Sequence, residues 1–90
     1  MKVSIITAVY NNSLYINDCI KSIKNQTYKD IEYIIIDGAS SDGTMQIINN
    51  FQIDKIISET DRGIYDALNK GIRLATGDII GLLHSDDVYN

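Results

Sequence analysis

Acidic residues recur in this sequence after apolar runs, in places where carboxylates could act together. They include Asp37, Asp61 and the adjacent pair Asp86 and Asp87. Carboxylates that lie close together raise one another's pKa unless a cation or a hydrogen-bond donor offsets their charge. Hard divalent cations prefer such oxygen ligands and can link carboxylates to a phosphate-bearing ligand. If these residues meet in space, a divalent metal site is the economical interpretation.

Whether they meet depends on the elements that carry them. Four near-continuous apolar runs, each bounded by turn-forming residues, predict buried strands over 3–9, 31–36, 55–58 and 79–83. Apolar residues at helical spacing predict three amphipathic helices between these strands. The predicted inward positions are Ile16, Ile20, Ile23 and Thr27 after a Ser13 N-cap; Thr44, Ile47, Ile48 and Phe51; and Ile64, Leu68, Ile72 and Ala75.

This alternation predicts an α/β fold, with an open, mostly parallel sheet of about four strands and helices on both faces. Ligands of such sheets bind outside the carboxyl ends of the strands. The segments expected at that edge are residues 10–11, 37–38, 59–61 and 85–87. The acidic residues are therefore predicted to converge there.

Each candidate also has a purely structural interpretation. Asp37 with the glycine after it can be a strand-ending turn, and Asp61 taken alone is better explained as a helix cap. Asp86 and Asp87 can form a solvated acidic turn. Cys19 lies on a helical stripe and is predicted to be a core residue, and Tyr65 is predicted to pack rather than to react.

Composition narrows the function classes. The chain has 90 residues, of which 44% are hydrophobic and 22% charged, and is predicted to form one unit over residues 1–90. Its formal charge of -4 argues against nucleic-acid binding. No apolar run approaches the length of a membrane span and the single Cys cannot form an internal disulfide, so a cytoplasmic location is expected. The first strand is not followed by a glycine-rich dinucleotide motif, and Thr44 stands where a phosphate-binding loop needs Lys.

Several blocks in this order resemble the N-terminal, donor-nucleotide-binding half of a family 2 glycosyltransferase with the A-type, nucleotide-diphospho-sugar-binding fold. The blocks are residues 3–11 (VSIITAVYN), 36–44 (IDGASSDGT), 61–71 (DRGIYDALNKG), 75–78 (ATGD) and 85–87 (SDD). The resemblance covers essentially the whole chain. It implies transfer of a sugar from a nucleotide diphosphate donor to an acceptor hydroxyl, usually with inversion and with Mg²⁺ or Mn²⁺.

The resemblance also assigns residues. It implies a nucleotide-sugar site formed by Ala8, Val9, Tyr10, Asp37, Asp61, Asn69, Ser85 and Asp86, with metal ligands Asp86 and Asp87. Asp37 would bond the base, and the metal would neutralise charge on the departing diphosphate. Many family members have Pro where this chain has Ala8 and Arg where it has Leu68. The acidic motif of the family often begins with Asp at the position of His84, so which of Asp86 and Asp87 ligates the metal stays open.

The general base of the family lies downstream of the acidic motif, so the chain is expected to be a fragment that cannot turn over alone. Its expected partners are the nucleotide-sugar donor and a sugar or lipid-linked acceptor, the latter reached by a peripheral membrane contact of the full-length protein. One alternative is a non-catalytic interaction module that forms a homo-oligomer through exposed sheet surface. A receiver-like or phosphoryl-transfer protein is disfavoured because no Lys follows a late strand.

Overall fold

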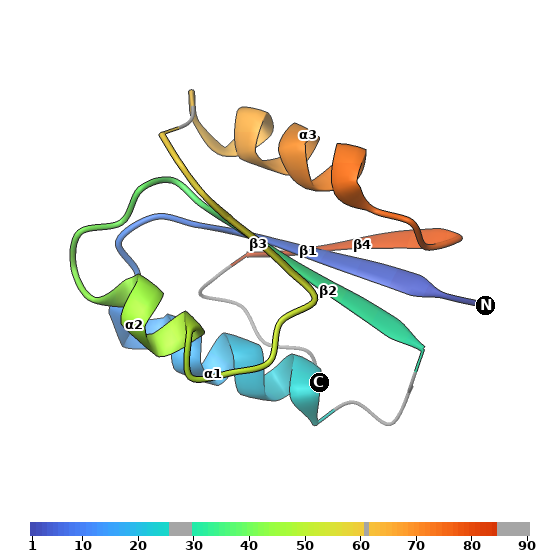
Figure 1. Ribbon diagram of the computed structural model, residues 1–90, viewed down its shortest axis with the longest axis horizontal. Helices are drawn as coiled ribbons and strands as arrows, with labels where there is room; N and C mark the ends of the chain where they lie inside the picture. Colours follow the sequence, from blue (N-terminus) through green and yellow to red (C-terminus); the bar gives the residue numbers. More distant parts are fainter. Residues whose placement is uncertain (26–29, 61, 85–90) are drawn as a thin grey trace.

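The computed structural model describes residues 1–25, 30–60 and 62–84. Within them, four strands form one sheet: β1 (Val3–Val9), β2 (Ile31–Asp37), β3 (Lys55–Ser58) and β4 (Ile79–His84). The sheet order is β3-β2-β1-β4 and every pair is parallel (Figure 1). The four predicted strands are confirmed to within one residue at each end.

Helices connect consecutive strands, as parallel pairing requires. They are α1 (Ser13–Lys24), α2 (Thr44–Ile48) and α3 (Ile64–Leu74). Figure 1 shows α1 and α2 on one face of the sheet and α3 on the other. The predicted α/β sheet with helices on both faces is confirmed.

Alternating side chains of β1 and β2 feed two separate apolar layers, because successive strand residues point to opposite faces. Ile5 and Ile35 pack in the layer that contains α1, whereas Ile6, Ile34 and Ile36 pack with Ala67 of α3. This two-sided burial explains why both strands are apolar at nearly every position.

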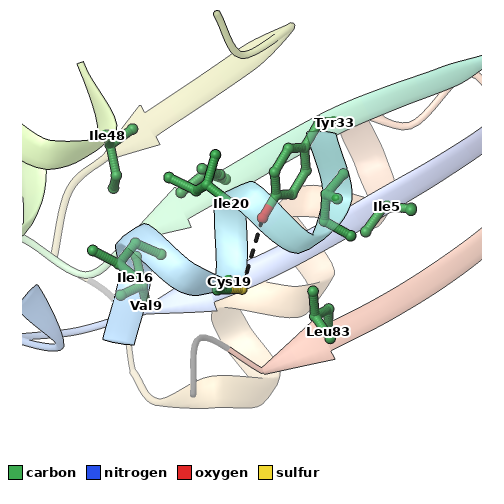
Figure 2. Packing of buried hydrophobic residues seen from close by; sticks show 10 residues of the cluster. Ile5, Val9, Ile16, Cys19, Ile20, Tyr33, Ile48 and Leu83 are labelled. Carbon is green, nitrogen blue, oxygen red and sulfur yellow. Dashed lines mark hydrogen bonds between the residues drawn. The ribbon is translucent and has the colours of Figure 1, made fainter. Parts of the chain in front are cut away.

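The α1 layer has a small polar contact at its centre, and Figure 2 shows the Tyr33 hydroxyl pointing toward Cys19. That hydroxyl lies 3.0 Å from Oγ1 of Thr7 and 3.9 Å from Sγ of Cys19. Cys19 is fully buried beside Ile16, Ile20 and Ile23, so its predicted core role and this helical stripe are confirmed. Thr27, the last residue predicted for the stripe, lies outside the described residues.

The predicted buried face of α3 is confirmed in part, because Leu68 and Ala75 pack against the apolar layer, whereas the side chain of Ile64 lies outside the described part. Ile72 is 43% exposed, and the fully buried positions are Ala67 and Gly71. A methyl group at Gly71 would lie 2.4 Å from Cγ2 of Ile6, so these small residues are the ones that approach the sheet. Tyr65 is 81% exposed, and its predicted packing role is wrong.

The helix starts also differ in detail. The N-cap of α1 is Asn12, and Ser13 is the first helical residue rather than the cap. The second helix has five residues and ends at Ile48, because the chain turns at Asn49 and Asn50 before it reaches Phe51. Among the described helices, none combines the length and apolarity that crossing a membrane requires.

The outer strands are less covered than β1 and β2. Ile80 and Leu82 of β4 are 43% and 52% exposed. They pair with Ser4 and Ile6, so they lie on the α3 face of the sheet, where α3 itself packs over β1 and β2. The prediction that all strands are buried is therefore wrong for β4, and also for β3, none of whose four residues is buried.

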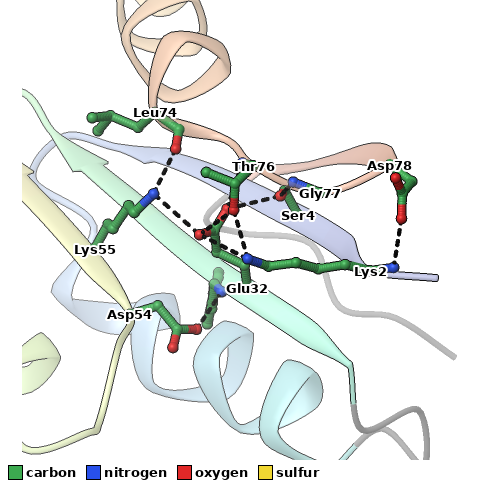
Figure 3. A network of polar contacts seen from close by, with 10 residues as sticks. Lys2, Ser4, Glu32, Asp54, Lys55, Leu74, Thr76, Gly77 and Asp78 are labelled. Carbon is green, nitrogen blue, oxygen red and sulfur yellow. Dashed lines mark hydrogen bonds and ion pairs between the residues drawn. The ribbon is translucent and has the colours of Figure 1, made fainter.

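A buried carboxylate joins the amino ends of the strands (Figure 3). Glu32 accepts hydrogen bonds from the Ser4 hydroxyl at 2.9 Å and from the amide and hydroxyl of Thr76 at 2.9 and 3.0 Å. Nζ of Lys55 lies 3.1 Å and Nζ of Lys2 3.5 Å from Oε2 of Glu32. Burial alone would raise the pKa of Glu32, but the Thr76 amide, Ser4 and Lys55 outweigh it and lower the pKa to about 2.

Candidate functional site

The carboxyl ends of the strands meet at one edge of the sheet, opposite the Glu32 cluster. Strand pairing aligns Ala8 with Ile36 and His84, and it aligns Asp37 with Val9 and Ser58. The described segments that follow β1, β2 and β3 therefore begin at this edge, as the parallel topology predicts.

A pocket of about 310 Å³ opens at this edge and is lined by Tyr10, Gly38, Ala39 and Thr60. Tyr10 was assigned to the nucleotide-sugar site, and Gly38 and Thr60 belong to segments that were predicted at this edge. Ala39 has a positive φ of 65° without being a glycine, a conformation that alanine rarely adopts. An alanine gives no sequence sign of such a backbone, so this wall of the pocket was not foreseen.

Asp37 directly precedes the lining residue Gly38, and its side chain is fully buried. Its Oδ2 accepts hydrogen bonds from the Ser40 amide at 3.0 Å and the Ser58 hydroxyl at 2.8 Å. Its Oδ1 accepts one from the Ser40 hydroxyl at 2.5 Å. The bonds to Ser40 stabilise the turn that follows β2, as the structural interpretation of Asp37 predicted. They also hold Asp37 at the carboxyl edge, where the functional interpretation expected it.

The loops after β1 and β2 are tied together by a second carboxylate, that of Asp42. Its Oδ2 accepts from the Ser13 amide and its Oδ1 from the Thr44 amide, both at 3.1 Å, and the Thr44 hydroxyl also donates to Oδ1. The Thr44 hydroxyl in turn accepts from the Asn12 amide at 3.1 Å. Hydrogen bonding, above all from Thr44, lowers the pKa of Asp42 to about 2 against a smaller effect of burial.

Two acidic residues near the start of α3 are engaged by a lysine. Nζ of Lys70 lies 3.1 Å from the Glu59 carboxylate and 3.7 Å from that of Asp66, and it donates to the Thr60 carbonyl at 3.2 Å. Asp66 also accepts from the Arg62 amide at 2.9 Å. That amide and, after it, Lys70 lower the pKa of Asp66. Within the described chain, Glu59 and Asp66 thus serve the structure of this helix start.

The other predicted site residues are distributed as follows. Ala8 and Val9 are the last residues of β1, directly before Tyr10. Asn69 is exposed on α3 and is not one of the pocket-lining residues. Asp61, Ser85, Asp86 and Asp87 lie outside the described residues. Among residues 1–25, 30–60 and 62–84, no three His, Cys, Asp or Glu side chains are grouped to hold a metal.

The fold is an open parallel α/β sheet with a pocket at its carboxyl edge, and a family model identifies the family. The model described as "Glycosyl transferase family 2" matches residues 4–90. The chain belongs to glycosyl transferase family 2. The resemblance seen in the sequence blocks is thereby confirmed over nearly the whole chain.

Relatives of this family 2 chain carry glycosyltransferase names. It is 38% identical over 89 residues to "Putative glycosyltransferase EpsH" of Bacillus subtilis, covering 94% of this chain and 26% of that protein. It is 44% identical over 91 residues to an uncharacterized glycosyltransferase of Haemophilus influenzae, covering 94% and 36%. The chain spans about a quarter to a third of the length of these curated relatives.

Solved glycosyltransferase structures share the fold. The mannosyltransferase PcManGT from Pyrobaculum calidifontis, in complex with GDP-Man and Mn²⁺, superposes with a TM-score of 0.89 at 27% identity. The match covers 98% of this chain and 28% of that one. TarS of S. aureus in complex with UDP-GlcNAc gives a TM-score of 0.90 at 26% identity, with coverage of 100% and 28%. The family 2 chain therefore has the A-type glycosyltransferase fold over the part that is compared.

Proposed function

We propose that this chain forms the donor-nucleotide-binding part of an inverting glycosyltransferase, which transfers a sugar from a nucleotide diphosphate to an acceptor hydroxyl. The observation that carries the proposal is the pocket lined by Tyr10, Gly38, Ala39 and Thr60 at the carboxyl edge of a family 2 chain. Structural neighbours of this chain bind GDP-Man and UDP-GlcNAc. We assign the base of the donor to this pocket.

The residues around the pocket could bind a nucleobase. Tyr10 is exposed at its mouth and offers an aromatic face, while Ala8 and Val9 fix the end of the strand that carries it. We propose Asp37 as the residue that bonds the nucleobase; its carboxylate is held by Ser40 and Ser58, and it directly precedes the lining residue Gly38. Asn69 and Asp61 complete the proposed nucleoside contacts, with Ser85 and Asp86 near the ribose.

We propose Mg²⁺ or Mn²⁺ as the cofactor, with Asp86 and Asp87 as its protein ligands. β4 leads toward these residues and ends at His84 opposite Ala8, on the strand that carries Tyr10. Mg²⁺ is commonly bound by one or two carboxylates together with substrate phosphates, so an adjacent pair of aspartates fits this chemistry. When bound, the cation would offset the negative charge that builds on the departing diphosphate.

We propose that the general base and the acceptor site belong to polypeptide outside these 90 residues. The short share of each relative that the chain spans supports this division. The proposed acceptor is a sugar or a lipid-linked molecule. The full-length protein is proposed to work in the cytoplasm, with peripheral contact to the membrane when the acceptor is lipid-linked. Fractionation of cells that express the full-length protein tests this location.

Isothermal titration calorimetry with UDP, GDP and dTDP, each with and without Mn²⁺, tests the donor site. We expect one of these nucleotides to bind and Mn²⁺ to tighten its binding. The absence of binding in both conditions for all three nucleotides would contradict the proposal. Sugar transfer by the 90-residue chain alone would contradict the assignment of the catalytic general base to another segment.

A second candidate function is a self-associating interaction module without catalysis. The observation that favours it is the exposed pair Ile80 and Leu82 on β4, an edge strand of the described sheet. Sedimentation equilibrium of the wild type and of Leu82→Lys measures such association, with Tyr65→Lys as a control at an exposed position on α3. A Leu82-dependent dimer that binds no nucleotide would favour the module over the enzyme.

A further inference from the structure

One lysine of α3 holds the segment that leads from β3 into this helix. Nζ of Lys70 lies 3.1 Å from Oε1 of Glu59 and donates to the Thr60 carbonyl at 3.2 Å. The same ammonium lies 3.7 Å from Oδ2 of Asp66, one helical turn earlier. An ammonium carries three N–H donors and no acceptor, so a single lysine can hold two carboxylates and a carbonyl together.

The Lys70 side chain is anchored by its helix and shielded from water. It is 17% exposed, compared with 31% for Asp66 and 57% for Glu59. Ala67 and Gly71 of the same helix approach the sheet closely, which fixes the backbone from which Lys70 extends. Ion pairs between fully exposed side chains contribute little, whereas partly buried charges are screened less by water and salt. The contacts of Lys70 therefore start from a rigid element.

These contacts end at a wall of the pocket. The Glu59 amide donates to the Asp37 carbonyl at 3.0 Å, so the chain is still attached to the sheet one residue after β3 ends at Ser58. Thr60 lies beyond that attachment and lines the pocket, and its carbonyl is held by Lys70 instead. Lys70 is not among the residues that line the pocket, so an effect on a ligand there would pass through Thr60.

We propose that Lys70 is a positioning residue, which fixes the Thr60 wall of the pocket and thereby sets its affinity for the donor nucleotide. The inference rests on the proposed function, because it takes this pocket as the nucleotide site. Direct attraction of the diphosphate by the ammonium is the competing explanation. Glu59 and Asp66 carry more negative charge than Lys70 can balance alone, which disfavours that explanation.

Calorimetry at a constant Mn²⁺ concentration tests the proposal. One probe is whichever of UDP, GDP and dTDP binds the wild type most tightly, and the other is the monophosphate of the same nucleoside. Lys70→Met removes the charge and the N–H donors from a side chain of similar length, whereas Lys70→Arg keeps both.

Lys55→Met is the matched control at the opposite, amino edge of the sheet. Lys55 also pairs with a carboxylate, that of Glu32 at 3.1 Å, and donates to a backbone carbonyl, that of Leu74 at 2.7 Å. Its loss should weaken the fold without reaching the pocket, and urea unfolding of each variant measures this cost in stability.

We expect Lys70→Met to weaken binding about three- to tenfold, the effect of one ordinary hydrogen bond. The factor should be the same for the mono- and the diphosphate, because the wall of the pocket is displaced for both. Lys70→Arg should restore most of the affinity, and Lys55→Met should bind both ligands as the wild type does.

Hydrogen exchange without a ligand tests the structural step by itself. If Lys70 holds the segment after β3, exchange of the Glu59 amide should accelerate in Lys70→Met and stay unchanged in Lys55→Met. Unchanged exchange in Lys70→Met would overturn the inference whatever the calorimetry shows.

Unchanged affinity of Lys70→Met would also overturn it, as would an equal loss in Lys55→Met or no recovery in Lys70→Arg. A loss confined to the diphosphate would overturn it by showing that the ammonium attracts the phosphates directly. If the wild type binds none of the three nucleotides, the proposed function fails and this inference with it, while hydrogen exchange still reports whether Lys70 holds the segment. If Lys70→Met does not fold, the shorter and polar Lys70→Gln carries the same comparison and the same expectation.

Discussion

Gly71 of α3 lies directly against Ile6 of β1, so closely that a Cβ at Gly71 would be 2.4 Å from Cγ2 of Ile6. We expect Gly71→Ala to destabilise the chain by about 1 to 2 kcal/mol, because overpacking exceeds the gain in helix propensity. Urea unfolding measures the change. In an Ile6→Ala background, where Cγ2 is absent, the same substitution should cost clearly less, and equal costs in both backgrounds would refute the steric explanation.

Removal of the buried charge at Glu32 tests the network at the amino edge. Glu32→Gln should lower the free energy of unfolding at neutral pH by roughly 2 to 3 kcal/mol, because two lysines and several donors lose a charged acceptor. Chemical denaturation of both proteins measures the difference. Asp30→Asn, at an exposed residue near the start of β2, is the control and should change little.

The same carboxylate predicts how stability depends on pH. Its folded pKa of about 2 lies below the ordinary value of 4.5, so its contribution is complete above pH 4.5 and is lost as pH falls toward 2. The stability difference between the wild type and Glu32→Gln should therefore shrink across this range. A difference that stays constant from pH 7 down to pH 2 would show that the charge of Glu32 is not its cause.

Thr44 bridges the loops after β1 and β2 through its buried hydroxyl. Thr44→Val keeps the shape but leaves the Asn12 amide and Asp42 without this partner, so we expect a loss of about 1 to 2 kcal/mol. Hydrogen exchange of the Asn12 amide should accelerate. Ser41→Ala in the same loop should leave that exchange rate unchanged, and unchanged exchange in Thr44→Val would contradict the bridge.

Tyr10 tests the aromatic wall of the pocket. Tyr10→Ala should weaken nucleoside diphosphate binding about three- to tenfold, because an exposed ring at the mouth of the pocket no longer covers the base. Tyr10→Phe keeps the ring and should bind nearly as well as the wild type. Titration with nucleoside diphosphate measures the affinity of all three proteins. Equal affinities of Tyr10→Ala and the wild type would show that Tyr10 does not contact the nucleobase.

The strands and their order could be predicted because isoleucine runs and the turns between them are local features of the sequence. The rule that ligands bind at the carboxyl edge of a parallel sheet predicted that Asp37 and Tyr10 lie at that edge, and the structure places them there. On α3 the prediction was right for Leu68 and Ala75 but wrong for Ile72. Helical periodicity counts large apolar residues, so it missed Ala67 and Gly71, which approach the sheet because they are small.

The finer parts of the site depend on information that is not local. The bond between Ser58 and Asp37 follows from the register of β2 and β3, and the backbone of Ala39 from the loop closure that Ser40 and Asn11 impose. Serine and alanine occur in many contexts, so their residue types alone do not predict these contacts. The roles assigned to Asp61, Ser85, Asp86 and Asp87 stay predictions.

The pairing of β1 with β4 has a consequence for how the chain folds. It joins Val3 to Ile79 and so closes a loop of most of the chain, whereas β1 and β2 pair across a much shorter separation. The entropy of closing a loop grows with its length, and contacts between distant residues slow folding. During synthesis, β1 therefore cannot pair with β4 until the last part of these 90 residues has left the ribosome. Until then one edge of β1 is unpaired, and unpaired strand edges make a folding chain prone to aggregate.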